Sequence, residues 1–310
     1  RQRQMCIRDR NNMKRLALLL AAMGIVSVGA MAEAPKLEVT SVGQEIEIEN
    51  QNGGASLDEV NFFQNVGLKY GDWTFGLQAG KQYSIDFDGD GMDSKNSRLQ
   101  LDVWKKVTPD LKLGARYRGY KEKDRWYARW DYSGSENMYW SAGDVWYEAT
   151  QNDNAGGKYD WVKAEVFPIG VKFDNFKVGY FLNYEFAVGS LSDKEQDEYI
   201  EHQIRAYWDF YKTERLTLSF EGRFTLAADL GYKGEEDQYR HYDNFGRIRT
   251  YLGASYKVTE SLTVYGKYAY EWRDYEYENG DSRENYGKYT AGKQSAENYQ
   301  DIIIGWNYKF

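Results

Sequence analysis

Residues 302–310 alternate between apolar and polar side chains. Ile302, Ile304, Trp306, Tyr308 and Phe310 are apolar or aromatic, and only Ile303 interrupts the polar residues and glycine between them. Side chains on a strand point alternately to opposite faces, so this pattern predicts a strand with one apolar and one polar face. An alternating strand rich in aromatic residues is typical of bacterial outer-membrane barrels, whose apolar face contacts lipid.

The pattern of the first 32 residues is typical of a leader sequence. Met13 is followed by two basic residues, an apolar run over 16–28 and the small-residue cleavage pattern Ala30-Met31-Ala32. This order predicts a secretory signal peptide over 13–32. We expect residues 1–12 to be non-native upstream sequence and 33–310 to be a single transmembrane β-barrel domain.

Composition excludes several classes of protein. Aromatic residues make up 17% of the chain, yet no apolar run after the signal reaches the length of a membrane-spanning helix. The net charge of −8 argues against nucleic acid as a partner. The single cysteine, Cys6, lies upstream of the signal, so the mature chain lacks a disulfide, a thiolate metal site and a cysteine nucleophile.

The alternating pattern predicts an all-β antiparallel barrel of 14 strands in the bacterial outer membrane. The connections alternate between short and long, as expected for periplasmic turns and external loops, and an even strand number puts both termini on the periplasmic side. The predicted strands are 36–49, 60–70, 73–83, 97–106, 111–121, 124–132, 137–149, 159–173, 176–187, 199–211, 215–227, 243–257, 262–275 and 299–310.

The polar face of these strands carries many ionised side chains. Burying unpaired ions would cost several kcal/mol each, so this face must be hydrated. About 16–18 strands leave an aqueous channel and about eight are filled by side chains, so 14 strands predict a narrowed pore. Mixed signs favour weak ion selectivity, and the excess of carboxylates favours a mild preference for cations. The predicted pore-lining residues are Lys112, Arg116, Arg118, Glu185, Arg205, Glu221, Arg223, Arg247, Arg249, Lys267 and Glu271.

Three segments are informative: the run Tyr268-Ala269-Tyr270-Glu271-Trp272-Arg273-Asp274, the segment Ile204-Arg205-Ala206-Tyr207 and the ending Trp306-Asn307-Tyr308-Lys309-Phe310. Together they resemble the outer-membrane porin G family. The resemblance is clearest over residues 200–310. It implies a monomeric 14-stranded porin that passes ions and small sugars and is gated by a mobile external loop, here 228–242.

The same resemblance implies a pH response from two histidines on neighbouring strands beside that loop. His241 matches one position, but Tyr275 stands at the other. Two imidazolium ions repel at low pH, whereas a histidine and a tyrosine do not. The acidic residues Glu235, Glu236 and Asp237 of the loop are the other candidates for a pH-dependent gate.

Asp86, Asp88 and Asp90 begin a segment with the spacing of a calcium-binding loop. Alternate oxygen ligands and a glycine suit Ca²⁺. The twelfth position is Ser97 rather than a bidentate glutamate, so a solvated acidic turn is the alternative. No other cofactor is expected.

The chain is not expected to be an enzyme. His202 and His241 are its only histidines, His202 falls in the lipid-facing phase of its strand, and no Gly-x-Ser-x-Gly motif occurs. We expect outer-membrane lipid and small hydrophilic solutes as partners. Two alternatives stay open: a channel specific for acidic oligosaccharides, in which inward arginines bind carboxylates, and a closed structural or adhesive barrel.

Overall fold

The computed structural model describes most of the chain after residue 34. Residues Leu37–Phe310 form one compact unit. The predicted upstream segment and signal peptide, 1–32, lie outside the described residues, so the predicted domain boundaries stay a prediction. The described residues are 35–51, 57–87, 89, 91–134, 138–150, 160–189, 196–232, 240–243, 245–273, 276–277 and 297–310.

All regular structure in the described residues is β-strand, so they contain no helix long and apolar enough to cross a membrane. The long strands are β1 (Glu38–Gln51), β2 (Leu57–Tyr70), β3 (Trp73–Asp86), β4 (Gly91–Lys106), β5 (Leu111–Gly119), β6 (Lys123–Ser133), β7 (Tyr139–Thr150), β8 (Asp160–Lys172), β9 (Phe176–Val188), β10 (Gln196–Lys212), β11 (Leu216–Tyr232), β13 (Arg247–Lys257), β14 (Leu262–Arg273) and β16 (Glu297–Lys309). Two short strands, β12 (Arg240–Asp243) and β15 (Glu276–Tyr277), accompany them.

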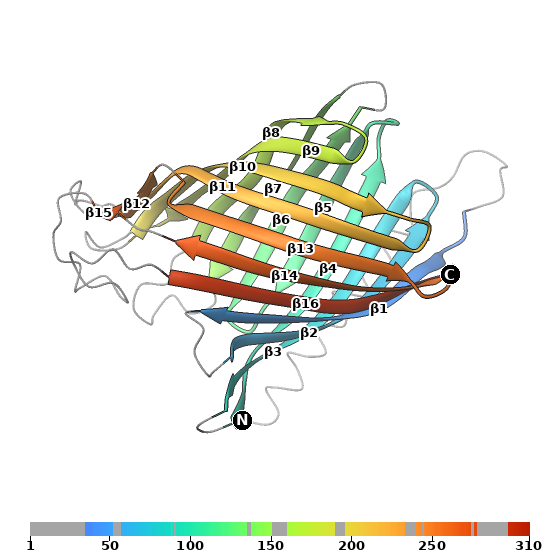
Figure 1. The fold of residues 1–310 in the computed structure, drawn as a ribbon, viewed down its shortest axis with the longest axis horizontal. Helices are drawn as coiled ribbons and strands as arrows, with labels where there is room; N and C mark the ends of the chain where they lie inside the picture. The colour runs from blue at the N-terminus through green and yellow to red at the C-terminus, as the bar shows by residue number, and fades with distance from the viewer. Residues whose placement is uncertain are drawn as a thin grey trace. The chain divides into compact units, whose positions relative to one another are not determined.

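Antiparallel pairing closes the sheet on itself. Each long strand pairs with its neighbours in the sequence, β1 pairs with β16, and β10 pairs with β11. β12 extends along β11 beyond the end of β13, and β15 pairs with β12. Figure 1 shows β11, β13, β14, β16 and β1 side by side along one wall. The predicted fold class, an antiparallel barrel of 14 strands, is confirmed.

Exposure is inverted relative to a water-soluble protein. Ile304 and Leu252 expose 59% and 58% of their surface, whereas Glu271 and Glu201 expose 1% and 2%. The exposed apolar residues and the buried charged ones alternate along the same strands. Apolar side chains therefore lie on the outer wall and ionised ones on the inner wall, as in a barrel surrounded by lipid.

Contacts that skip a strand identify the concave side. Arg129 on β6 binds Asp102 on β4 across β5, with 2.6 Å between Nη1 and Oδ1. Arg247 on β13 binds Glu201 on β10 across β11, with 3.1 Å between Nη1 and Oε2. Side chains converge on the inner side of a curved sheet, so these residues line the lumen.

Three short turns share one local design. The hydroxyl of Thr108 accepts a hydrogen bond from the backbone N–H of Leu111 at 3.0 Å, and Thr213 and Thr259 do the same for Leu216 and Leu262 at 2.9 Å. The sequence Thr-x-x-Leu thus encodes each turn, because a threonine hydroxyl stabilises a turn through nearby backbone amides. The leucine then starts the next strand.

The first strand begins, and the last strand ends, at the end of the barrel that carries these turns. The backbone N–H of Lys309 donates to Ser261 O at 2.9 Å, and that of Phe310 donates to Thr40 O at 3.2 Å. This agrees with an even number of strands. The expectation that this end faces the periplasm stays a prediction.

Three predicted boundaries were wrong. The predicted external loop 228–242 is strand at both ends, because β11 extends to Tyr232 and β12 begins at Arg240. The predicted loop 84–96 is largely an extension of the β3–β4 hairpin, with Ser84 paired to Asp93 and Asp86 to Gly91. These residues lack alternation because polar side chains occupy both faces. The predicted strand 243–257 is divided at Phe245, which has a φ of +67°, an unusual conformation for a bulky residue.

Candidate functional site: the polar lumen

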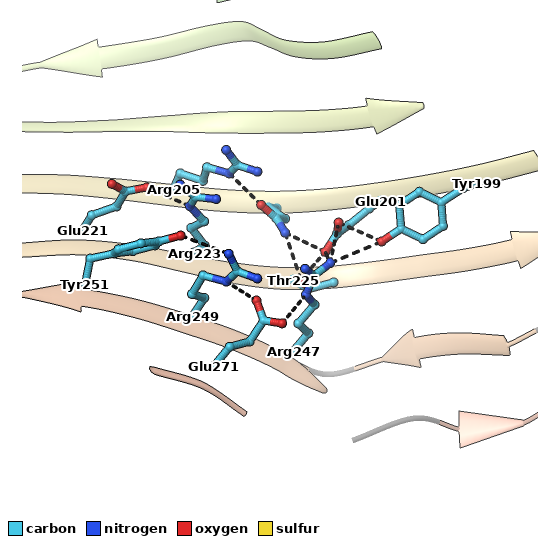
Figure 2. A network of polar contacts seen from close by, with 11 residues as sticks. Tyr199, Glu201, Arg205, Glu221, Arg223, Thr225, Arg247, Arg249, Tyr251 and Glu271 are labelled. Carbon is cyan, nitrogen blue, oxygen red and sulfur yellow. Dashed lines mark hydrogen bonds and ion pairs between the residues drawn. The ribbon is translucent and has the colours of Figure 1, made fainter. Parts of the chain in front are cut away.

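The first group of lumen residues comes from β10, β11, β13 and β14 (Figure 2). Glu271, on β14, receives hydrogen bonds or ion pairs from two arginines of β13. Its Oε1 lies 3.2 Å from Arg247 Nε, and its Oε2 accepts from Arg249 Nε. Arg247 also reaches Glu201, so a chain of alternating charges runs along this wall.

Neutral groups complete the environment of Glu201. Thr225 Oγ1 and Gln203 Nε2 each donate to Glu201 Oε1 at 2.6 Å, and Tyr199 donates to Oε2 at 2.8 Å. A buried carboxylate is stable only when hydrogen bonds and opposite charge replace its hydration. Here Tyr199, Gln203 and Thr225 supply the hydrogen bonds, and Arg247 supplies the opposite charge.

The second group comes from β4, β5, β6 and β7. Arg116 and Arg129 each contact two aspartates, Asp102 and Asp144. Their Nε–Oδ1 distances are 2.6 Å, from Arg116 to Asp102 and from Arg129 to Asp144. Two cations and two anions therefore form a closed ring on this wall, which fixes the two long arginine side chains that project inward.

A third group surrounds Glu148, which is 5% exposed. Arg125 Nε donates to this carboxylate, Lys123 Nζ lies 3.6 Å from Oε2, and Lys163 Nζ lies 3.8 Å from Oε1. Lys163 also pairs with Glu185 at 2.8 Å. Bases outnumber acids among these residues, so this part of the wall is positive.

The wall formed by β16, β1 and β2 is acidic. Glu45, Glu47 and Glu49 occupy alternate positions on β1, Glu59 faces Glu49 on β2, and Asp301 faces Glu49 from β16. Tyr265 donates a hydrogen bond to Glu45 Oε2 at 2.9 Å. The strand phase places these carboxylates on the lumen face, beside a wall rich in arginine, so charge is segregated around the lumen.

Two ionisable residues on the lumen face remain exposed. Glu165 on β8 and Lys267 on β14 are both exposed although their strand phase points them inward. Arg223 on β11 acts electrostatically on Glu165 and also on Asp301 of β16. Each of those strands lies three positions from β11, on opposite sides. Arg223 therefore projects into the lumen.

The predicted lining residues all follow the lumen phase of their strands, although their role in conduction is a proposal. Lys112 lies at the turn end, 3.8 Å from Asp131. The structure brings Arg247, Arg249 and Glu271 into one cluster and leaves Lys112 apart. The predicted lining residues sorted by strand are Lys112, Arg116 and Arg118 of β5, Glu185 of β9, Arg205 of β10, Glu221 and Arg223 of β11, Arg247 and Arg249 of β13, and Lys267 and Glu271 of β14.

The predicted gate and calcium loop fall mostly on residues that are not described. Glu235, Glu236 and Asp237 lie outside the described residues, and His241 belongs to β12, where its backbone faces Glu276 of β15. Asp86 ends β3, whereas Asp88 and Asp90 lie outside the described residues. The described residues contain no cluster of three or more acidic, histidine or cysteine side chains suited to a metal.

The histidine predicted to face lipid lies on the outer wall. His202 Nδ1 is 2.7 Å from the hydroxyl of Tyr180, the two rings are stacked, and both residues are on the apolar phase of their strands. A hydrogen bond to a neighbouring tyrosine satisfies a polar atom of the imidazole there. This contact accounts for His202 without a catalytic role.

Sequence reasoning missed an aromatic cluster inside the barrel. Trp140 packs against Phe167 at 4.8 Å between ring centroids, and Phe167 packs against Phe181 at 5.0 Å. Gly170 and Gly179 lie beneath the indole, where a Cβ would clash with it. The two glycines in the lumen phase of β8 and β9 were the available signal, because small residues make room for a large neighbour. The cluster narrows one side of the lumen near the turn end.

The chain matches no protein-family model, and no curated protein is similar to it in sequence. Its structural neighbours include a monoaromatic hydrocarbon channel, CymD, at 10% identity and a TM-score of 0.49, covering 88% of this chain and 89% of that one. An anion-selective porin from Comamonas acidovorans has 10% identity and a TM-score of 0.43, covering 89% and 100%. OccK3 from Pseudomonas aeruginosa has 10% identity and a TM-score of 0.45, covering 88% and 96%.

Proposed function

We propose that the protein is an outer-membrane porin for passive diffusion of ions and small hydrophilic solutes, sugars among them. The observation that supports this most strongly is the exposure of two ionisable lumen residues, Glu165 and Lys267, inside a wall whose outer surface is apolar. A barrel sealed by packing would bury these side chains or pair them. Their exposure favours a hydrated path over a closed structural or adhesive barrel.

The lining sets the expected selectivity of this porin. Acidic and basic residues occupy different walls, so ions of both signs find a favourable surface, and selectivity is expected to be weak. Long arginine side chains held by ion pairs narrow the lumen. The exclusion limit is therefore set by a few fixed guanidinium groups rather than by backbone.

The finer features of the proposal follow the resemblance to the porin G family. We infer a monomer with both termini in the periplasm and an external gate that includes Glu235, Glu236, Asp237 and His241. Calcium binding by Asp86, Asp88 and Asp90 is a separate proposal, which calcium titration of the refolded protein would test. No catalytic role is proposed for any residue.

Planar-bilayer recording tests the proposed function directly. The refolded protein, residues 33–310, should produce stepwise currents, and the Arg223→Ser variant should have a higher single-channel conductance because it removes a side chain that projects into the lumen. Lys105→Gln, at an exposed position on the outer wall near a short turn, is the control and should leave conductance unchanged. Absence of any current steps from correctly folded protein would contradict the proposal.

A further inference from the structure

The lumen arginines fall into two groups by the partner that holds them. Most are held by carboxylates, as Arg249 is by Glu271. Arg98, Arg118 and Arg205 instead hydrogen-bond to the side-chain oxygens of Gln78, Gln100 and Gln203, respectively. Within the described residues, none of these three arginines lies within 4.0 Å of a carboxylate oxygen. We call them the glutamine-held arginines.

The glutamine amides are themselves fixed. Each offers its oxygen to the arginine, which has only donors, and its NH₂ group to a second acceptor. The second acceptors are Asn65 Oδ1 for Gln78 at 2.8 Å, Asp102 Oδ2 for Gln100 at 2.5 Å and Glu201 Oε1 for Gln203 at 2.6 Å. A neutral amide therefore orients each guanidinium without cancelling its charge.

An aromatic ring supports each of the same guanidinium groups. Arg98 lies 4.1 Å from the centroid of Phe63, Arg118 lies 5.4 Å from that of Tyr127, and Arg205 lies 3.3 Å from that of Phe181. Stacking on a ring fixes the plane of a guanidinium and leaves its charge intact. The guanidinium donors that could form charge-assisted hydrogen bonds with a carboxylate therefore remain available.

Arg98 and Arg118 are neighbours on the lumen face. Gln100 of β4 faces Arg118 of β5, and Arg98 is the next residue of β4 on that face, so the two arginines are diagonal neighbours. Arg118 also lies opposite Arg125 of β6. The Arg125 guanidinium lies 5.2 Å from the ring centroid of Tyr120, and the Tyr120 hydroxyl lies in the electrostatic field of all three arginines. Like charges placed opposite each other on a sheet destabilise it, which is a cost that a purely structural wall would avoid.

Within the described part of the chain, one donor of this cluster lacks a partner. Arg98 Nε is buried and forms no hydrogen bond, although the Nη2 group of the same guanidinium is held by Gln78. A buried unpaired donor is unfavourable, so a site with this donor is stabilised when an acceptor arrives. Arginine presents its N–H groups in a fork that matches both oxygens of a carboxylate.

We propose that Arg98 and Arg118 form a binding subsite for the carboxylate group of an anionic solute, such as a sugar acid, as it passes through the lumen. The inference rests on the proposed function, because a solute reaches these residues only through an open lumen. The subsite adds a preference for one class of solute to a channel that otherwise discriminates weakly.

The test is block of single-channel current by glucuronate, with glucose as the neutral probe of equal ring size. Wild-type protein should be blocked by glucuronate at lower concentrations than by glucose. Arg98→Gln and Arg118→Gln should weaken the glucuronate block roughly tenfold each, the scale of one charge-assisted hydrogen bond, and leave the effect of glucose unchanged.

Gln78→Glu tests the role of the free Arg98 charge most directly. It retains Arg98 but places a carboxylate beside it, so it should weaken the glucuronate block as much as Arg98→Gln does. Asn307→Asp, which adds one negative charge at a lumen-phase position of β16, is the matched control and should retain the block. Should Arg98→Gln fail to insert, Gln78→Glu carries the same comparison.

Three results would overturn the subsite. They are equal block by glucuronate and glucose in the wild type, an unchanged block in Gln78→Glu, and an equal loss in Gln78→Glu and Asn307→Asp. Each of these requires stepwise current, so the porin function would stand. Absence of current in the wild type would instead remove the proposed function and the subsite with it.

Discussion

Placing arginine at Ile304 should destabilise the barrel by about 2–4 kcal/mol, whereas arginine at the adjacent Ile303 should cost far less. Ile304 is 59% exposed on the outer wall, opposite Ile46 of β1. Ile303 points inward, near the carboxylates Glu47 and Asp301. A charge at Ile304 must enter lipid, while a charge at Ile303 gains acidic neighbours.

Urea titration of the two variants in phospholipid vesicles, monitored by tryptophan fluorescence, measures this difference. Both variants carry the same added charge on adjacent residues of β16, so each is the control for the other. Equal destabilisation of Ile303→Arg and Ile304→Arg would contradict the assignment of inner and outer walls. The placement of the ionised side chains in the lumen would then also be wrong.

Removing the Glu271 carboxylate should be the most destabilising single change in the lumen. Glu271 is 1% exposed and binds both Arg247 and Arg249. Glu271→Ala leaves two nearby guanidinium groups without their shared counter-charge, and breaking a buried ion pair in this way costs about 3–5 kcal/mol. The expected result is a lower urea midpoint with an unchanged slope.

A second variant separates lost pairing from lost packing. In Glu271→Gln the side-chain volume is retained and the charge is removed, so most of the destabilisation should persist. Glu214→Gln, at an exposed turn position, is the control and should change the free energy of unfolding by less than about 0.5 kcal/mol. A stability of Glu271→Gln equal to the wild type would contradict the role of this carboxylate.

Local signals in the sequence predicted the barrel well. Period-2 alternation predicted where strands run and which face of each is apolar, because side chains on a strand must alternate. The short gaps between the predicted strands also contain the turns that Thr108, Thr213 and Thr259 stabilise in the structure. Boundaries failed where both faces of a strand are polar, as in the β3–β4 hairpin, since alternation then carries no signal.

The arrangement of charges could not be predicted in this way. Arg247 and Glu201 are 46 residues apart, and their contact depends on the curvature that brings β13 and β10 together across β11. The glutamine-held arginines depend likewise on register: Arg118 meets Gln100 because β4 and β5 pair with that offset. A shift of one residue would turn either side chain to the opposite face.

The sequence by itself determined that this chain forms strands with an apolar and an ionised face, because that property is local to each segment. Only the tertiary structure decided which ionised residues pair with each other and which arginines keep their charge available. Strand closure, register and curvature set those partners, and they join residues that are distant along the chain.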